Sequence, residues 1–324
     1  MIRADQLSIV IPAYDIAGYL EACLASIREH GGATSRVILV DDGSRDLDEA
    51  TRQRLSAVFG GDLRWTRIPH AGAGAARNMG LSMVETPWVT FIDGDDVIVN
   101  QGLERLCESA EPAVDIVFSN KMVSWNIPKR IEHLTEFPAK SQVPIAELPV
   151  ERRLSCHGKL FRTDFLHGHE IAFPEGMVWE DIVFSHRTYR HAERVSAIAD
   201  ITYFWLKRPP GVGSVTQKPL NPVAIQDRFR QVEMSVEISE TAEWRANFGT
   251  SFDLPQLLAR RLSAVFRAMR QPNLEAESAA ALATIHALCA PHWPRLLSSR
   301  RPNARLLFEH VRDMDLTALR AMAE

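Results

Sequence analysis

Three groups of acidic residues are the side chains of this sequence best able to do chemistry. They are Asp15, the pair Asp41 and Asp42, and the triplet Asp93, Asp95 and Asp96. Each group follows an apolar segment that has the length of a strand. Carboxylates gathered in one place repel one another unless they share a cation or hydrogen-bond donors. A hard divalent ion, held by one or two carboxylates and by substrate phosphates, would satisfy such a group.

The elements that would bring these groups together follow from the apolar pattern. Continuous apolar runs at Leu7–Ile11, Val37–Val40 and Trp88–Ile92 predict buried strands, and another strand is expected near residues 63–68. Between the first two runs, apolar side chains of residues 20–27 recur at the spacing of one helical face. Strands that alternate with helices imply an α/β fold with a mostly parallel sheet covered on both faces. Ligands bind beyond the carboxyl ends of the strands in such a sheet, which is where the acidic groups fall.

The remaining elements are less regular in their pattern. Short helices are expected up to Met83 and around residues 103–109, a longer helix over 179–191, and one or two strands within 195–206. Prolines punctuate residues 120–175, which we expect to form a long excursion over the sheet.

Each acidic segment also has a purely structural interpretation. The compositions of Asp41–Ser44 and Asp93–Asp96 are favoured in turns. Glu180 and Asp181 open a predicted helix, where the helix dipole favours acidic side chains. Three carboxylates directly after a buried strand are nevertheless a costly way to make a turn.

Cationic residues occur in three further segments. Gly72–Asn78 lacks the third glycine of a dinucleotide fingerprint, yet its small residues permit close approach of the backbone to a ligand. The same segment places Arg77 one turn into a helix. His157 and Lys159, and Arg208 in a loop rich in Pro and Gly, are equally compatible with surface positions.

Taken in order, these segments resemble the family 2 glycosyltransferases of the GT-A fold. The matching segments are residues 8–14, 40–44, 72–80, 91–96, 159–162, 179–182 and 203–216. The resemblance spans about residues 5–217, and seven motifs in the family's order make it specific. It implies that residues 1–220 form the GT-A catalytic domain, with a Rossmann-like, mostly parallel sheet flanked by helices.

The resemblance also implies a role for each matching residue. It assigns nucleotide-sugar binding to Pro12, Ala13, Tyr14, Asp15, Asp42, Gly72, Arg77, Asp93, Gly94, Lys159, Arg208, Ser214 and Thr216. Asp93 and Asp95 match the DxD element that binds ribose and an Mn²⁺ or Mg²⁺ ion, and Asp96 is an alternate ligand. Asp181 matches the general base, and Glu180 beside it would orient the acceptor or the base. Asp15 stands where the family usually has Asn.

These roles imply a metal-dependent, inverting glycosyltransferase. The expected donor is a nucleotide-sugar of the UDP-sugar type, and the expected acceptor is a hydroxyl of a saccharide or polyol phosphate in a bacterial surface polymer. Negative charge develops on the leaving diphosphate, and a metal ion and fixed cations can stabilise it. The acceptor hydroxyl is a poor nucleophile, so a carboxylate must take its proton as attack proceeds. A single base on the face opposite the leaving group gives inversion at C1.

Two other functions stay open at this point. A scaffold that binds nucleotide-sugars without turnover would keep the same fold. An aspartyl phosphatase would use Asp93 as a nucleophile that forms a phosphoaspartate. Its motif normally opens the domain, however, whereas two strand–helix units precede Asp93 here.

The chain changes character after residue 220. Apolar residues recur at helical spacing in 257–269, 279–288 and 305–311, which predicts a helical region over residues 221–324. Arginines surround an apolar stripe there: Arg260, Arg261, Arg267 and Arg270. Such a stripe occurs on membrane-surface helices and also on helices that pack on a neighbour. Peripheral contact with a membrane or a polyanionic acceptor, and homo-oligomerisation, are therefore both open.

Composition sets the outer limits of the interpretation. The 324 residues are 46% hydrophobic and 24% charged, which describes a soluble globular chain. The net charge of −4 argues against a dedicated nucleic-acid binder, which needs a basic face. The four cysteines lie far apart without CxxC spacing, so a reducing compartment fits best. Without an apolar run of about 18 residues or a signal-type N-terminus, we expect a cytoplasmic protein, with a peripheral position at the inner membrane face left open.

Overall fold

The computed structural model describes residues 2–126, 129–133, 137–150, 154–207, 220–271 and 273–322. The chain divides into two compact units, Met1–Pro210 and Gly211–Glu324. The boundary expected from the sequence, after residue 220, lies ten residues beyond this division. Among the residues described, no helix combines the length and the apolar character that crossing a bilayer requires.

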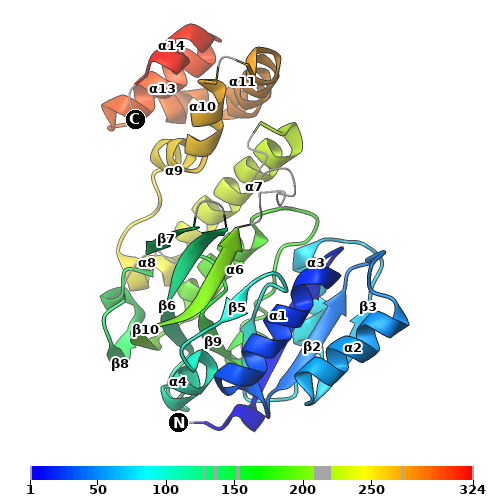
Figure 1. The fold of residues 1–324 in the computed structure, drawn as a ribbon. Coiled ribbons are helices and arrows are strands. Elements are labelled where there is room, and N and C mark those ends of the chain that lie inside the picture. Colours follow the sequence, from blue (N-terminus) through cyan, green and yellow to red (C-terminus); the bar gives the residue numbers. More distant parts are fainter. Residues whose placement is uncertain are drawn as a thin grey trace. The chain divides into compact units, whose positions relative to one another are not determined.

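The first unit contains a ten-stranded sheet with helices on both faces (Figure 1). Its strands are β1 (Leu7–Ala13), β2 (Arg36–Asp41), β3 (Leu63–Arg67), β4 (Trp88–Phe91), β5 (Val97–Ile98), β6 (Ile116–Asn126), β7 (Lys129–His133), β8 (Lys140–Pro144), β9 (Lys159–Arg162) and β10 (Arg194–Lys207). Its helices are α1 (Ala17–Ile27), α2 (Glu49–Phe59), α3 (Ala73–Ser82), α4 (Gly102–Glu108), α5 (Thr163–Gly168) and α6 (Glu180–His191). The predicted α/β class with a flanked sheet is confirmed.

The strand order along the sheet is β3-β2-β1-β4-β9-β6-β10-β5, with β7 beside β6 and β8 beside β10. Strands β3, β2, β1 and β4 pair in parallel, as the alternation of strands and helices predicts. Parallel neighbours place their carboxyl ends at the same edge of the sheet. The loops that follow β1, β2 and β4 therefore converge there, and they carry the acidic groups.

The expectation for residues 120–175 was wrong in one respect. These residues do not only pass over the sheet, because four strands, β6 to β9, lie wholly or partly within them. Strand β9 inserts between β4 and β6 and runs antiparallel to both. It has four residues and begins with Lys159, so its sequence shows neither a long apolar run nor the alternation of a half-buried strand.

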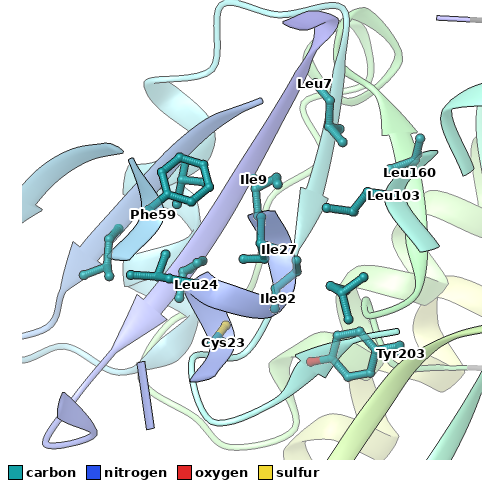
Figure 2. Packing of buried hydrophobic residues seen from close by; sticks show 14 of the residues in the cluster. Leu7, Ile9, Cys23, Leu24, Ile27, Phe59, Ile92, Leu103, Leu160 and Tyr203 are labelled. Atoms are coloured by element: carbon teal, nitrogen blue, oxygen red, sulfur yellow. The ribbon is translucent and has the colours of Figure 1, made fainter. Parts of the chain in front are cut away.

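Alternate residues of β1 pack against different layers of helices. Leu7, Ile9 and Ile11 belong to a buried cluster that includes apolar residues of α1, α2 and α4. Figure 2 shows Ile9 of this cluster with Cys23, Leu24 and Ile27 of α1. Val10 faces the other layer, since a Cβ placed on Gly80 of α3 would lie 2.3 Å from its Cγ1. The period of two in a strand explains this division.

A second cluster, of aromatic rings, joins β4 to α6. Phe91 of β4 contacts Phe161, Phe173 and Phe184, with ring centroids 4.9 to 6.0 Å apart. Phe173 also stacks on Phe184 of α6 at 3.8 Å. These contacts hold the segment before α6 and the helix itself against the face of the sheet that α3 also covers. They therefore fix the start of α6, where Glu180 and Asp181 lie.

The second unit is helical, as predicted. Its helices are α7 (Pro222–Ser239), α8 (Ala242–Phe248), α9 (Leu254–Arg261), α10 (Ser263–Met269), α11 (Glu275–Cys289), α12 (Trp293–Leu297), α13 (Pro302–Arg312) and α14 (Leu316–Ala321). Asn221 caps α7 by accepting a hydrogen bond from the amide of Val223, with proline at the first helical position. The pattern in 257–269 corresponds to two helices that meet at Leu262.

Candidate active site

The acidic triplet forms one cluster in the loop between β4 and β5. Carboxylate oxygens of Asp93, Asp95 and Asp96 all lie within 4.8 Å of one another. Asp93 and Asp95 are half-buried, and Asp96 is buried. Gly94, between them, faces the core, since a Cβ there would lie 2.6 Å from Cδ2 of Leu20. Close packing against α1 therefore gives a structural reason for glycine at 94.

Two cationic side chains face the carboxylate of Asp93. Nη2 of Arg77 donates to Oδ1 at 2.6 Å, and Nε2 of His157 lies 3.1 Å from the same oxygen. Burial raises the pKa of Asp93, but the charges of His157 and Arg77 outweigh burial and hold the pKa well below its usual range. Burial lowers the pKa of His157, and the Asp93 charge more than offsets it, so that pKa lies well above its usual range. Asp93 is therefore a stable carboxylate.

Asp96 has a different environment from Asp93. Its Oδ2 accepts from the hydroxyl of Tyr203 at 2.5 Å, and its Oδ1 accepts from the amide of Leu206 at 2.8 Å. Tyr203 also accepts from the amide of Asp93 at 3.2 Å. Burial, with the neighbouring charges of Asp93 and Asp95, raises the pKa of Asp96 well above its usual range. Asp96 thus joins the acidic loop to β10, and it also belongs to the cluster of carboxylates that could hold a metal ion.

Arg77 connects the acidic cluster to the start of α6. Its guanidinium forms ion pairs with Asp93 and with Glu180, the first residue of α6. Burial raises the pKa of Glu180, Arg77 opposes this effect, and the charge of Asp181 adds to it. The charge of Asp181, a half-buried residue, also raises the pKa of Arg77. Arg77 therefore links Asp93, an expected metal-binding residue, to Glu180, which precedes the expected base Asp181 in the sequence.

The turn before α6 is clamped to α3 by backbone contacts. Asn78 of α3 donates from Nδ2 to the carbonyl of Phe173 at 2.9 Å and accepts at Oδ1 from the amide of Phe173 at 2.8 Å. A Cβ on Gly74 would lie 2.3 Å from the carbonyl oxygen of Pro174, so only glycine permits this approach. Trp179 adopts φ of 73° directly before Glu180. Such a conformation is strained for a bulky residue and often marks a functional turn.

The loop that leads into α3 is held by Asp42. Its buried carboxylate accepts from the amides of Ala71 at 2.7 Å and Gly72 at 2.9 Å, and from Nδ1 of His70 at 2.9 Å. His70 stacks on the ring of Tyr14, with centroids 4.0 Å apart. Gly72, directly before α3, has φ of 93° and ψ of 168°, a conformation that glycine adopts readily. Tyr14 and His70 thus present exposed rings beside the ends of β1 and β2.

Other residues expected at the donor site lie at the end of β1 and in the loop that follows it. Pro12 is half-buried and Ala13 is buried at the end of β1, and the carbonyl of Ala13 accepts from the amide of Asp42. Asp15, at φ of 49°, forms an ion pair with Arg45 and accepts from its amide at 2.8 Å. The arginine side chain and its amide hold the pKa of Asp15 below its usual range.

Lys159 does not lie on the surface of the site. It is fully buried, its ammonium donates to the carbonyl of Ser155, and it lies 5.5 Å from the ring centroids of Phe118 and Tyr189. The ammonium of Lys159 thus contacts protein groups inside the core, where the carbonyl of Ser155 and two aromatic rings offset part of the cost of burying its charge. Arg208, Ser214 and Thr216 lie outside the described residues.

The sequence left two residues of the site unassigned. His157 was equally compatible with a surface position, and Tyr203 began a segment that resembles the family but had no role assigned to it. The structure stacks their rings, with centroids 5.3 Å apart, beside Asp93 and Asp96. His157 lies in a short polar segment directly after Cys156 and before β9. Nothing in the local pattern of this segment indicates that it would lie beside Asp93.

The carboxylate set fits a hard divalent cation. The cluster offers oxygen ligands only, which suit Mg²⁺ and Mn²⁺ better than softer metals. Arg77 and His157 offset part of the negative charge on the Asp93 side. Asp93, Asp95 and Asp96 are the residues that could hold such an ion.

Residues 8–169 match the model of the family described as glycosyl transferase family 2. The chain therefore belongs to glycosyl transferase family 2, and it is a glycosyltransferase. The two other functions left open by the sequence find no support in this match.

Several curated relatives are similar over part of the chain. EpsJ of Bacillus subtilis, described as an uncharacterized glycosyltransferase, is 25% identical over 236 residues, which cover 69% of this chain and 67% of EpsJ. GlyA of Streptococcus pneumoniae, a glycosyltransferase, is 31% identical over 60% of this chain and 30% of its own length. TarS of Staphylococcus aureus, a poly(ribitol-phosphate) β-N-acetylglucosaminyltransferase, is 24% identical over 64% of this chain and 36% of TarS.

The crystal structure of Staphylococcus aureus TarS 1–349 in complex with UDP-GlcNAc is also similar. It superposes with a TM-score of 0.67 at 20% identity and covers 97% of this chain and 89% of that chain. At this identity the similarity shows a shared fold, which includes a C-terminal helical region.

Proposed function

We propose that this glycosyltransferase moves a sugar from a UDP-sugar to a hydroxyl of a saccharide or polyol-phosphate polymer, with inversion at C1 and with Mn²⁺ or Mg²⁺. The observation that carries the proposal is the link through Arg77 between Asp93 of the acidic cluster and Glu180 beside Asp181. Support for the donor and acceptor classes comes from TarS, whose name and complex specify UDP-GlcNAc and poly(ribitol phosphate).

In this proposal the acidic cluster binds the diphosphate end of the donor. Asp95 and Asp93 would hold the divalent ion, which supplies stabilisation of negative charge on the leaving diphosphate. Tyr14 and His70 present rings at the ends of β1 and β2, where the base of the nucleotide would stack. Asp42 keeps these loops in place through the amides of Ala71 and Gly72.

Asp181 is the proposed general base. It takes the proton of the acceptor hydroxyl while the new bond to C1 forms and the bond from C1 to the diphosphate oxygen breaks. A half-buried position at the start of α6 leaves its carboxylate accessible to an acceptor. Glu180 is more buried and paired with Arg77, so it is less suited to receive that proton.

The test is a screen of UDP-, GDP-, dTDP- and CDP-sugars with Mn²⁺ or Mg²⁺, in which release of the nucleoside diphosphate is measured. Asp181→Asn should lower kcat by about 10² to 10⁴ while UDP affinity changes little. The matched control is Asp164→Asn, an exposed aspartate in the first turn of α5. Normal turnover by Asp181→Asn would refute the base assignment, and release of phosphate without any nucleotide product would refute the reaction class.

A further inference from the structure

The side chain of Arg77 is almost completely enclosed by other protein groups. Its side chain is 4% exposed. One terminal nitrogen pairs with Glu180, the other lies 2.6 Å from Asp93, and the guanidinium carbon lies 5.4 Å from the ring centroid of Phe173. Both terminal nitrogens are therefore directed at protein carboxylates, and the planar group is covered on one face by an aromatic ring.

The two carboxylates that Arg77 joins belong to different parts of the proposed site. Asp93 lies in the acidic loop after β4, which would hold the metal and the diphosphate. Glu180 begins α6, 103 residues from Arg77 in the sequence, and is covalently next to the proposed base Asp181. A guanidinium is a rigid planar fork, so it fixes the separation and orientation of two carboxylates bound at its two ends.

The neighbouring contacts of α3 act on the same turn. The side chain of Asn78 forms two hydrogen bonds with the backbone of Phe173. Because Gly74 has no Cβ, α3 can approach the carbonyl of Pro174 closely. The start of α6 therefore depends on one face of α3, with Arg77 at the point where that face meets the acidic loop.

We propose that Arg77 is a positioning residue that sets the place of the Asp181 turn relative to the carboxylates holding the donor, by bridging Asp93 and Glu180 rather than by contacting the nucleotide. The inference deepens the proposed function and rests on it for the role of Asp181. It replaces the nucleotide contact that the family resemblance implies for Arg77.

The first test separates kcat from donor affinity. Arg77→Lys keeps the charge but lacks the fork, so we expect kcat to fall about 100-fold, the cost of a misplacement near 1 Å. UDP affinity in the presence of Mn²⁺ should stay within about threefold, because the donor contacts are intact. A loss of UDP affinity of about 30-fold with kcat retained would assign Arg77 to the donor and overturn the proposal.

Two further variants test the bridge, and the first of them keeps the test informative if Arg77 variants fold poorly. Gly74→Ala leaves Arg77 in place but pushes the turn away from α3, so it should reproduce the selective loss of kcat. Arg77→Met combined with Glu180→Gln removes the bridge without leaving Glu180 as an unpaired buried charge, and it should be no slower than Arg77→Met alone. Independent losses in the double variant would contradict an action through Glu180. Arg162→Met is the matched control, since Arg162 forms a half-buried pair with Asp115 within the same unit.

Hydrogen exchange supplies a readout that needs no turnover. Arg77→Lys should raise the exchange of amides in residues 176–184 of the free protein, and Arg162→Met should not. Unchanged exchange in this segment would overturn the bridge whatever the substrate proves to be. If the wild-type protein neither binds UDP with Mn²⁺ nor transfers sugar, the proposed function fails separately, because the exchange result does not depend on it.

Discussion

Replacing Asp42 by Asn should loosen the loop that leads into α3. The buried carboxylate accepts three hydrogen bonds, from the amides of Ala71 and Gly72 and from His70. An asparagine keeps one acceptor oxygen and presents an NH₂ group to the remaining donors. The variant therefore loses at least one hydrogen bond to a charged acceptor. In addition, the NH₂ group of the asparagine would face a backbone N–H group in a buried position, where neither can accept.

The expected cost follows from these contacts. A hydrogen bond to a charged group contributes about 1.5–3 kcal/mol, and a buried polar group left unsatisfied costs about 1–3 kcal/mol. Proton rearrangement on His70 can restore one bond, so we expect the free energy of unfolding of the first unit to fall by about 3 kcal/mol. For a unit of this size such a change lowers the unfolding midpoint by about 8 °C.

Thermal and urea unfolding of the full chain, followed through a probe in the first unit, measures this loss. Two units are present, so the two transitions must be separated before a free energy is assigned. Asp48→Asn is the matched control, because Asp48 caps α2 from an exposed position and Asn caps equally well. A change below about 0.5 kcal/mol in Asp42→Asn would refute the view that this carboxylate holds the loop.

Three further outcomes are expected. The four cysteines are buried, and burial raises the pKa of Cys107 to about 12, so a thiol reagent at pH 8 should react only when the protein unfolds. At that pH the thiolate fraction of Cys107 is about 10⁻⁴, and labelling of the native chain as fast as that of a free thiol would contradict this. Gly94→Ala should cost about 1–3 kcal/mol, read from thermal unfolding, since its Cβ would lie 2.6 Å from Leu20 and 2.7 Å from Ile16. UDP at a hundredfold excess over its Kd should stabilise the protein against unfolding by about 2.7 kcal/mol. Removal of divalent ions with EDTA should abolish this stabilisation. Equal stabilisation by UDP with and without EDTA would exclude a role for a metal in donor binding.

Much of the first unit could be predicted because its signals are local. The apolar runs at the start of the chain and the helical spacing between them are sufficient to predict β1, β2, β4 and the helices around them. The placement of Asp42 and Asp93 at one edge follows from a general property of parallel strands. The start of α6 at Glu180 was also predictable, because the helical pattern begins there.

Other features depend on pairings between distant segments. Strand β9 pairs with β4 and β6 across 41 to 74 residues of sequence, and nothing in its four residues specifies those partners. The insertion of β9 buries Lys159, whose charge suggested an exposed contact, and directs His157 toward Asp93. Both outcomes were beyond sequence reasoning because side-chain burial is decided by the neighbouring strands.

The sequence by itself determined the α/β class, the family, and which acidic residues meet at the edge of the sheet, since these depend on short-range patterns and on motif order. Only the tertiary structure decided what each charged group faces. Arg77, Lys159 and Gly94 share motif segments with residues of the site, yet one joins two carboxylates, one lies in the core and one packs against α1. The physical reason is that charge pairing and packing act over a few ångströms in space, between residues that the chain separates by more than a hundred positions.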